Sequence, residues 1–328
     1  MITKMLKGIA VTAIVLMFAG TMAYVRWRNR QIERVESNST VVETTQGPVE
    51  YSIIGEGPAV LVLHGTLGGY DQLQPMVRLL NAGSYRFIFV SRPGYLRTPL
   101  STGGGFEEQA DAYAALLDEL GIDQVAVLAI SGGGPSALQF ALRYPERCWG
   151  MVMLSANADV EAGNANRASE RSGESARQPP RVVTNIVFSD LSSWVLVGAS
   201  KLLPRQFLTV LVGEEYVEEV LIDPAKRALY TESVDSLALL SRRRAGALND
   251  GAQFLTFTGY PFQDVTAPML ILHGASDNAV NTAQPRHLDA TVPDSRFIEI
   301  EGGTHYMLIS HHDILAPLIL DFLDAHVP

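Results

Sequence analysis

Ser131 is the residue whose setting predicts chemistry most directly, because it stands between a buried strand and a helix. The apolar, β-branched run Val125–Ile130 is typical of a strand buried in a parallel sheet, and a helix-forming run follows at Ser136–Arg143. Between them lie only Ser131, three glycines and Pro135, and a proline suits a first helical turn. Such a turn projects the hydroxyl from the sheet edge, as a nucleophile elbow does. A phosphate-binding loop fits less well, since the sequence lacks the Gly-Lys-Ser/Thr signature there.

A serine hydroxyl needs a base to take its proton and an acid to orient that base. Two later loops supply these residue types, each directly after a predicted strand: Asp277 follows Pro268–His273, and His305 follows Arg296–Ile300. Parallel strands present their carboxyl ends at one edge of the sheet, so all three side chains are expected to meet there. The sequence therefore predicts a Ser-His-Asp triad of Ser131, His305 and Asp277.

Taken together, four segments resemble the α/β-hydrolase superfamily over roughly residues 48–326. They are His64–Gly69, Arg92–Tyr95, Ala129–Gly133 and the paired loops of Asp277 and His305. The chain departs from the family pattern at Ala129, where glycine is usual, at Ser91, where an aspartate is common, and at Leu96, where a glycine often follows the tyrosine. The resemblance implies a serine-nucleophile member with an inserted helical cap, hydrolytic acyl chemistry, and neither a metal nor an organic cofactor.

The resemblance leaves two candidate acids. Some members of the family carry the acid after an earlier strand, and Asp159 follows the predicted strand Gly150–Ala156. Asp277 is preferred, because its loop is similar to the usual acid loop of the family. The choice matters for the mechanism, since the acid sets the tautomer of the histidine.

Two backbone N–H groups are expected to stabilise the oxyanion of a tetrahedral intermediate. Gly132 follows the nucleophile directly and lies at a helix N-terminus, which favours negative charge. The second donor, by similarity with the family's His-Gly-x pattern, is Thr66, with Leu67 as the neighbouring alternative. His64 competes as a base, but its place at a strand end favours a structural role in holding this loop.

The N-terminal segment determines where the protein is expected to reside. Gly8–Val25 contains eighteen residues without a charge, and as a helix it would extend about 27 Å, close to the thickness of a bilayer's hydrocarbon core. A cleaved signal peptide, with a small-residue site at Thr21–Ala23, followed by export is one interpretation. We prefer an uncleaved, single-pass signal anchor, because the apolar run is long and Arg26, Arg28 and Arg30 follow it. Basic residues on both sides leave the sidedness open.

Composition and patterning divide the chain into four parts. Residues 1–30 are predicted to be a membrane anchor, residues 31–46 a polar stalk, residues 47–156 and 264–328 an α/β core, and residues 157–263 a helical cap with a mobile segment at 160–180. The core alternates strands and helices, which predicts a mostly parallel, doubly covered sheet. Residues 1–36 carry six Lys and Arg against two Glu, whereas the remainder carries nineteen basic against thirty-three acidic residues. So acidic a body argues against a nucleic acid partner, and the single Cys148 allows no disulfide within the chain.

These observations predict a membrane-anchored serine hydrolase of α/β-hydrolase fold. Its substrate is expected to be a small carboxylic ester with a rather apolar acyl group, which is cleaved through an acyl-serine intermediate and held against apolar residues of the cap. The same triad would also suit hydrolysis of a C–C bond in a diketone, cleavage of an amide or a lactone, or peracid formation by a perhydrolase. A non-catalytic ligand receptor on a hydrolase fold is the alternative from a different class.

Overall fold

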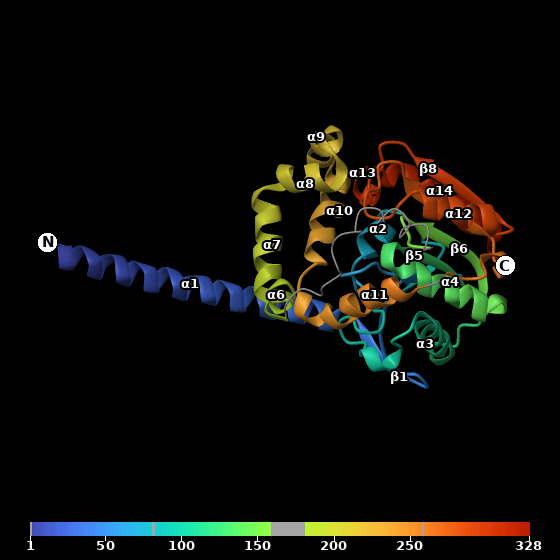
Figure 1. Cartoon of the computed structure of the whole chain (residues 1–328), viewed down its shortest axis with the longest axis horizontal. Helices are drawn as coiled ribbons and strands as arrows, with labels where there is room; N and C mark the ends of the chain where they lie inside the picture. The colour runs from blue at the N-terminus through green and yellow to red at the C-terminus, as the bar shows by residue number, and fades with distance from the viewer. Residues whose placement is uncertain (1, 81–82, 159–180, 258) are drawn as a thin grey trace.

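The computed structural model describes residues 2–80, 83–158, 181–257 and 259–328 (Figure 1). The centre of this described part is one eight-stranded sheet with the order β1-β2-β4-β3-β5-β6-β7-β8. The strands are β1 (Thr40–Thr44), β2 (Gly47–Ile54), β3 (Ala59–Leu63), β4 (Arg86–Val90), β5 (Val125–Ile130), β6 (Cys148–Leu154), β7 (Met269–Gly274) and β8 (Ser295–Ile300). β1 pairs with β2, and β2 with β4, in antiparallel fashion, and every other neighbouring pair is parallel. The predicted mostly parallel sheet is confirmed.

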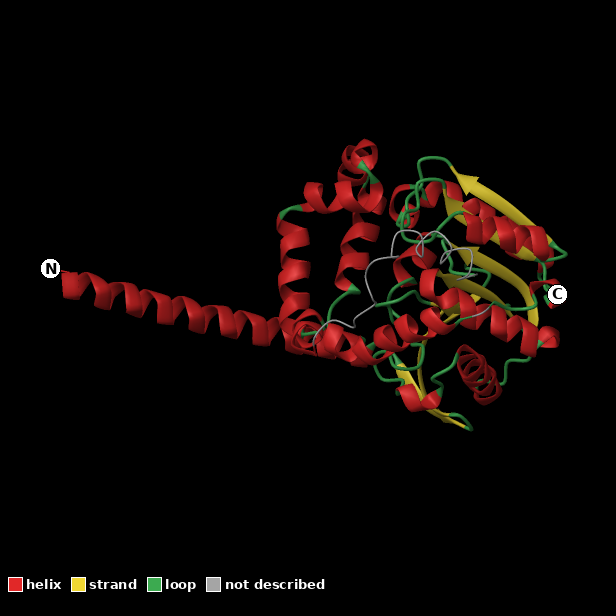
Figure 2. Cartoon of the chain, viewed as in Figure 1, coloured by secondary structure: helices red, strands yellow, loops and turns green. Residues whose placement is uncertain are grey.

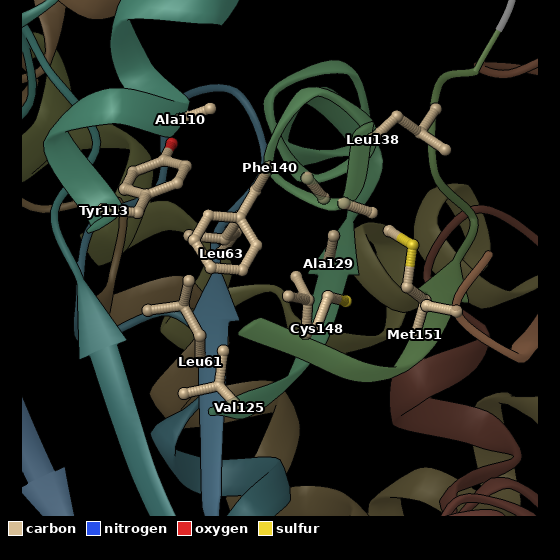
Figure 3. Packing of buried hydrophobic residues seen from close by; sticks show 14 of the residues in the cluster. Leu61, Leu63, Ala110, Tyr113, Val125, Ala129, Leu138, Phe140, Cys148 and Met151 are labelled. Carbon is tan, nitrogen blue, oxygen red and sulfur yellow. The ribbon is translucent and has the colours of Figure 1, made fainter. Parts of the chain in front are cut away.

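Burial on both faces explains why the central strands read as continuous apolar runs. All residues of β3, β5 and β6 are buried. Successive side chains point to opposite faces, so Leu61 and Leu63 join one core and Val60 and Val62 join another. Figure 3 shows part of the first of these cores.

Helices of the α/β core cover both faces of the sheet. They are α2 (Gln74–Leu79), α3 (Phe106–Glu119), α4 (Gly134–Arg143), α12 (Ala283–Thr291), α13 (Met307–Ser310) and α14 (His312–His326). Residues of α3, α4 and α12 pack in the core that holds Leu61. Residues of α2 and α14 pack in the core that holds Val60. The sheet is therefore covered on both sides, as the alternating pattern predicts.

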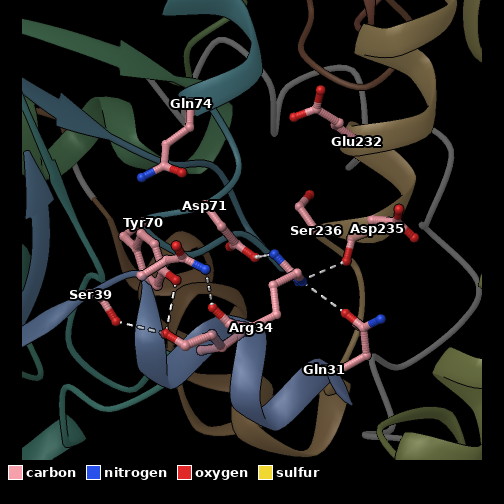
Figure 4. Close-up of polar contacts among 12 residues, drawn as sticks. Gln31, Arg34, Ser39, Tyr70, Asp71, Gln74, Glu232, Asp235 and Ser236 are labelled. Carbon is pink, nitrogen blue, oxygen red and sulfur yellow. Dashed lines mark hydrogen bonds and ion pairs between the residues drawn. The ribbon is translucent and has the colours of Figure 1, made fainter. Parts of the chain in front are cut away.

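The sequence predicts a polar stalk over residues 31–46, but the structure places these residues in the folded body. Helix α1 (Ile2–Ser37) continues into this stretch, and β1 then pairs at the sheet edge. Val35 is completely buried, while Arg34 donates to Asp71 Oδ2 at 3.1 Å and to the Asp235 carbonyl at 3.2 Å (Figure 4). The stalk prediction is wrong because the polar groups of this stretch find partners on the body rather than in water.

The described helices between β6 and β7 form the cap. They are α6 (Arg181–Val187), α7 (Asp190–Leu202), α8 (Pro204–Val212), α9 (Val217–Ile222), α10 (Pro224–Asp235) and α11 (Arg244–Thr256). α8 lies over the loop after β8, because the Thr304 hydroxyl donates to the Leu211 carbonyl at 2.6 Å. The apolar stretch over 182–203 forms two helices, since Ser189 caps α7 by accepting from Ser192 N at 3.1 Å. The segment at 160–180 that is predicted to be mobile lies outside the described residues.

Helix α1 runs away from the body as one continuous helix (Figures 1 and 2). Over the described part of the chain, no single helix combines the length and hydropathy that a membrane span requires. The bent pair of α6 and α7, which meet at 48°, passes the same criterion by length and composition alone. The predicted transmembrane helix therefore stays a prediction.

The backbone approaches itself closely where β7 and β8 leave the sheet. A Cβ on Gly274 would lie 2.2 Å from the Gly303 carbonyl oxygen and 2.7 Å from the Thr304 carbonyl oxygen. These atoms belong to the loops that carry Asp277 and His305. Because only glycine fits between them, this contact fixes how far apart the two loops lie.

Gly274→Ala is expected to lower the free energy of unfolding by about 1–3 kcal/mol, because overpacking against backbone forces the two loops apart. Gly251→Ala on α11 is the matched control, since a Cβ there would meet nothing within 4 Å. Alanine in that helix should be neutral or stabilising by roughly 0.5–1 kcal/mol. Thermal unfolding followed by circular dichroism compares the two variants, and equal stability would show that the loops separate at no cost.

Candidate active site

Ser131 lies where β5 turns into a helix, in a backbone conformation that residues with a side chain rarely adopt. Its φ is +49°, in the left-handed region. A short 3-10 turn over Ser131–Gly133 follows, and α4 begins at Gly134. The Ser131 carbonyl accepts from Asn157 N at 2.9 Å, which ties the turn to the residues after β6. This is the strand–serine–helix turn that the sequence predicts.

The structure brings the three predicted triad residues together. Ser131 Oγ lies 3.0 Å from His305 Nε2, and His305 Nδ1 lies 2.8 Å from Asp277 Oδ2. The other carboxylate oxygen, Asp277 Oδ1, accepts from the backbone N–H groups of Ala279 at 2.8 Å and Val280 at 2.9 Å. The acid is thus held by its own loop and in turn orients the imidazole toward the serine. Such an arrangement can pass the serine proton to the histidine.

Burial and charge act in opposite directions on Asp277. Removal from water alone would raise the pKa of this carboxyl, but the hydrogen bond to His305 and the electrostatic attraction between the two groups outweigh burial and hold the pKa of Asp277 below its usual value. Behind the acid, His273 Nε2 lies 3.6 Å from Asp277 Oδ2 and 3.1 Å from the Val280 carbonyl. Burial lowers the pKa of His273, so this imidazole is neutral and donates to that carbonyl. The site therefore holds an ionised acid beside a neutral His273.

The loop after β3 places Thr66 against Gly132. A Cβ on Gly132 would lie 2.4 Å from Thr66 Oγ1 and 3.0 Å from Thr66 N, so only glycine fits beside the serine on this side. The two predicted oxyanion donors therefore belong to adjoining residues at the nucleophile. Leu67, the alternative donor, follows in the same loop with φ +67°. The assignment of these N–H groups to an oxyanion stays a prediction.

Asp250 is a candidate functional residue that sequence reasoning missed. It comes from cap helix α11, is 1% exposed, and accepts from Arg92 Nη1 at 3.0 Å and from Arg92 Nη2 at 2.5 Å. The hydroxyls of Tyr95 and Thr66 donate to the same carboxylate at 2.6 Å and 3.0 Å. Asp250 thus ties the cap to the loop that carries Thr66. No local motif marks it, although an arginine and a tyrosine in the segment 92–95 signal that an acid partner is needed.

His64 holds the loop after β3 rather than serving as a base. It is 2% exposed, its Nδ1 lies 2.7 Å from the Gly65 carbonyl, and its Nε2 accepts from the Arg92 backbone N–H at 3.0 Å. Burial and the charge of Arg92 lower the pKa of His64 well below 6.5, so the imidazole is neutral and protonated at Nδ1. Both ring nitrogens are committed to the backbone, which supports the predicted structural role.

Three further predictions concern the alternative acid, a metal site and the single cysteine. Asp159, the alternative acid, lies outside the described residues. Among the residues that the structure describes, no group of three or more His, Cys, Asp and Glu side chains is arranged to hold a metal ion. Cys148 is buried, and burial raises the pKa of its thiol to about 12, so it is a protonated packing residue.

Comparison with known proteins places these features in a family. Residues 58–312 match the family model described as alpha/beta hydrolase fold. The uncharacterized hydrolase YcgS of Bacillus subtilis (strain 168) is 30% identical over 251 residues, which cover 74% of this chain and 82% of that protein. An alpha/beta hydrolase fold protein from Nakamurella multipartita superposes with a TM-score of 0.75 at 29% identity, covering 88% of this chain and 99% of that structure.

Two further relatives differ in the substrate that their names give. A 2-hydroxy-6-oxononadienedioate/2-hydroxy-6-oxononatrienedioate hydrolase of Dechloromonas aromatica (strain RCB) is 24% identical, covering 84% of this chain and 90% of that protein. A pimeloyl-(acyl-carrier protein) methyl ester esterase of Aromatoleum aromaticum is 27% identical, covering 80% of this chain and 97% of that protein. At these identities the relatives support hydrolysis in general and leave the substrate open.

Acidification is expected to destabilise the fold before its carboxylates titrate. Because the pKa of His64 is lowered in the folded state, the unfolded chain, with its ordinary value of 6.5, binds this proton first. The contribution of a neutral His64 to the free energy of unfolding should be complete above about pH 6.5. As the pH falls further, the free energy of unfolding should decrease by up to about 1.4 kcal/mol per pH unit, until the folded-state pKa is reached. The thermal unfolding midpoint measured between about pH 7.5 and 5.5 checks the sign. A midpoint that stays constant or rises on acidification contradicts a buried neutral His64.

Proposed function

This chain belongs to the α/β-hydrolase fold family and is a hydrolase of that fold, and on this premise we propose that it cleaves a carboxylic ester through an acyl-serine intermediate. Ser131 is the proposed nucleophile, His305 the base and then the acid, and Asp277 the residue that orients the imidazole. The observation that carries the proposal is the continuous relay from Ser131 Oγ through both ring nitrogens of His305 to the carboxylate of Asp277. A relay of this kind activates a serine that is otherwise a weak nucleophile.

In acylation, Ser131 Oγ attacks the carbonyl carbon of the ester while His305 Nε2 takes the hydroxyl proton. The oxyanion develops beside the N–H groups of Gly132 and Thr66, and the intermediate collapses as the imidazolium gives its proton to the departing alcohol. In deacylation, His305 takes a proton from water, which attacks the acyl group, and then returns that proton to Ser131. Asp277 keeps Nδ1 protonated and stabilises the imidazolium in both steps.

An ester without a free carboxylate fits the described surroundings of the triad. Arg92 and Arg243 lie close to the loop that carries Thr66, and both are completely buried. Arg92 pairs with Asp250 and Arg243 with Asp71, so these two cations are neutralised by the protein and not directed at a substrate. The esterase among the relatives supports the same choice.

A C–C bond hydrolase is the second candidate, because the relative from Dechloromonas is named as a hydrolase of a 6-oxo dioate, a ketone that contains no ester to cleave. The same serine and histidine can add to a ketone instead of an ester. The substrate in that name is a dioate, which requires cations that reach the pocket. Comparing hydrolysis of a neutral short-chain ester with that of a dienedioate distinguishes the two candidates.

We further propose that α1 anchors the protein in a membrane. Four consecutive residues of α1, Val15–Phe18, are 59%, 67%, 68% and 68% exposed. Consecutive residues lie around the whole circumference of a helix, so no face of this stretch packs against the body. An apolar helix that is exposed all round is stabilised by burial in hydrocarbon. Export after cleavage of this segment is the alternative.

A fluorophosphonate is expected to label the folded protein at Ser131 alone, because only a serine with a base and oxyanion donors reacts rapidly with such electrophiles. Ser131→Ala should abolish labelling, and His305→Ala should slow it by about 10³-fold or more. Ser136→Ala is the matched control, since the Ser136 hydroxyl contacts Tyr113 and the Gly133 carbonyl rather than a histidine. Peptide mapping identifies the labelled residue. A folded protein that stays unlabelled supports the receptor alternative and overturns the proposal.

The full-length protein is expected to stay in the membrane pellet after an alkaline carbonate wash. The double variant L16R/F18R should be released, because each arginine near the centre of a span costs about 2.5–3.5 kcal/mol. Glu33→Arg, beyond the apolar run, is the control and should be retained. Labelling of Ser131 in the released fraction reports that the variant is folded. Release of the unchanged protein, or retention of L16R/F18R, contradicts the anchor.

A further inference from the structure

The buried face of helix α7 is mostly polar, with Val197 as its one apolar buried residue, whereas its outward stripe is apolar. The side chains that face the body include Asp190 and Ser193, which are 6% and 0% exposed. The opposite stripe consists of Leu191, Val195 and Leu202, which are 52%, 58% and 82% exposed. A helix that packs on a globular body in water normally buries its apolar stripe and exposes its polar one. The outward stripe of α7 is therefore unexplained by the fold alone.

The polar groups that α7 buries have hydrogen-bond partners, which fix the orientation of the helix on the body. Ser193 Oγ accepts from Leu240 N at 3.0 Å, and Asp190 Oδ1 accepts from the Ser241 hydroxyl at 2.6 Å. Turning the helix to bury its apolar stripe would leave these buried groups without hydrogen-bond partners, which is unfavourable. The same bonds hold α7 on the body and do not permit it to cross a bilayer. The apolar stripe is thus a permanent surface of the folded chain.

The apolar surface continues from α7 onto α6. On α6, Val182, Ile186 and Val187 are 67%, 61% and 51% exposed. We call the large apolar residues of these two helices that are more than half exposed the cap face. It consists of Val182, Ile186, Val187, Leu191, Val195 and Leu202. Exposed apolar residues gathered on two helices that follow one another in the chain indicate a site of interaction.

Helix α1 leaves the body beside the first turns of α7. The rings of Tyr24 and Trp194 lie 5.8 Å apart, and Arg28 Nε donates to Asp190 Oδ2 at 2.7 Å. These contacts join the end of the apolar run of α1 to the first turns of α7. Figures 1 and 2 show that α7 runs across the direction in which α1 leaves the body. A bilayer entered by α1 would therefore have its surface parallel to α7.

The side chains at this junction have the composition of a membrane–water interface. Tyr24, Trp27 and Trp194 lie there together, and the exposed Arg26 and Arg30 lie on the same turns of α1. Tyrosine and tryptophan collect at the headgroup level, and arginines follow a span at its end. The apolar run of α1 ends at Val25, one residue from these groups. The boundary between apolar and charged residues on α1 therefore coincides with the position of α7.

We infer that the cap face is a lipid-binding surface that lies in the interface of the same bilayer that holds α1. The inference rests on the proposed anchoring and extends it to the cap, which lies on the membrane rather than across it. A bilayer is the occupant, because the first turns of α7 contact the aromatic residues and arginines at the end of the apolar run of α1. The cap also contacts the catalytic edge, since α8 accepts the Thr304 hydroxyl beside His305. Apolar esters dissolved in the bilayer are the substrates that this placement favours.

The test measures contact between the cap face and lipid in the full-length protein. Val195→Cys is labelled with bimane, and the protein is reconstituted into phosphatidylcholine vesicles whose acyl chains carry a doxyl quencher near the headgroup. At least about a twofold loss of emission is expected at Val195, as for a side chain in the interface. Ile53→Cys is the matched control, because Ile53 is 42% exposed and lies on strand β2. There it pairs with Ile88, two residues before β4 ends at Val90, so it lies away from the catalytic edge of the sheet. Its emission should not change. The natural Cys148 is buried and does not compete for the label.

Phe18→Cys on α1 separates failure of this inference from failure of the proposed anchor. Quenching at Phe18 without quenching at Val195 overturns the cap face and leaves the anchor intact. No quenching at either position overturns both, whereas Ser131 labelling reports independently on the proposed hydrolase. Disulfide formation between two chains at Val195→Cys, without quenching by lipid, would identify a second copy as the occupant and also overturn the inference.

A pair of charges on the cap face tests the functional consequence. V195D/L202D should lose about tenfold or more of the rate on a long-chain ester presented in vesicles, because two charges on the cap face oppose its contact with lipid. Its rate on a short soluble ester should be unchanged, and Ile53→Asp should change neither rate. An unchanged rate on the vesicle substrate contradicts entry of substrate from the bilayer.

Discussion

A serine with positive φ at the end of β5 is the constraint on which the rest of the catalytic edge depends. Holding a residue with a side chain in the left-handed region costs on the order of 1–3 kcal/mol, so the neighbours must fix it. They do so by close backbone approach: a Cβ on Gly134 would lie 2.0 Å from the Asn157 carbonyl oxygen. β5 pairs with β3 on one side and β6 on the other, and the turn follows directly at its end. The Ser131 hydroxyl is thereby directed at His305.

Two buried carboxylates then join separate parts of the chain to this turn. Asp250 binds Arg92, Tyr95 and Thr66, so the cap and the loop after β3 move together. Asp71 accepts from Arg34 of α1 and from Arg243, which directly precedes the cap helix α11. Buried ion pairs contribute little net stability. If one member of a pair moves away, however, the other is left as a buried charge without a partner, which is strongly destabilising. The arrangement therefore favours one fixed placement of cap, core and α1.

How much the sequence predicts depends on whether the signal is local. The apolar run Val125–Ile130 matches β5 in both bounds, and the strands that lead to Asp277 and His305 are found within one residue of their predicted starts. Asp250 was missed because its partners are more than 150 residues away in sequence, so no spacing reports the contact. β1 was missed because none of its residues is buried, so this edge strand has the polar pattern of a linker. Leu96, where the family often has glycine, adopts φ +50°, so the departure is a strained residue rather than a different turn. The inverted polarity of α7 shows only once the buried face is known.

The central claim is that Ser131 carries the acyl group during turnover. Rapid mixing of the full-length protein with an activated ester, followed by acid quench and intact-mass analysis, measures this directly. The account predicts a species heavier by one acyl group, formed in a burst and located at Ser131 by peptide mapping, with a second phase as water removes it. Turnover of the ester without any acylated protein, or acylation at another residue, would contradict it.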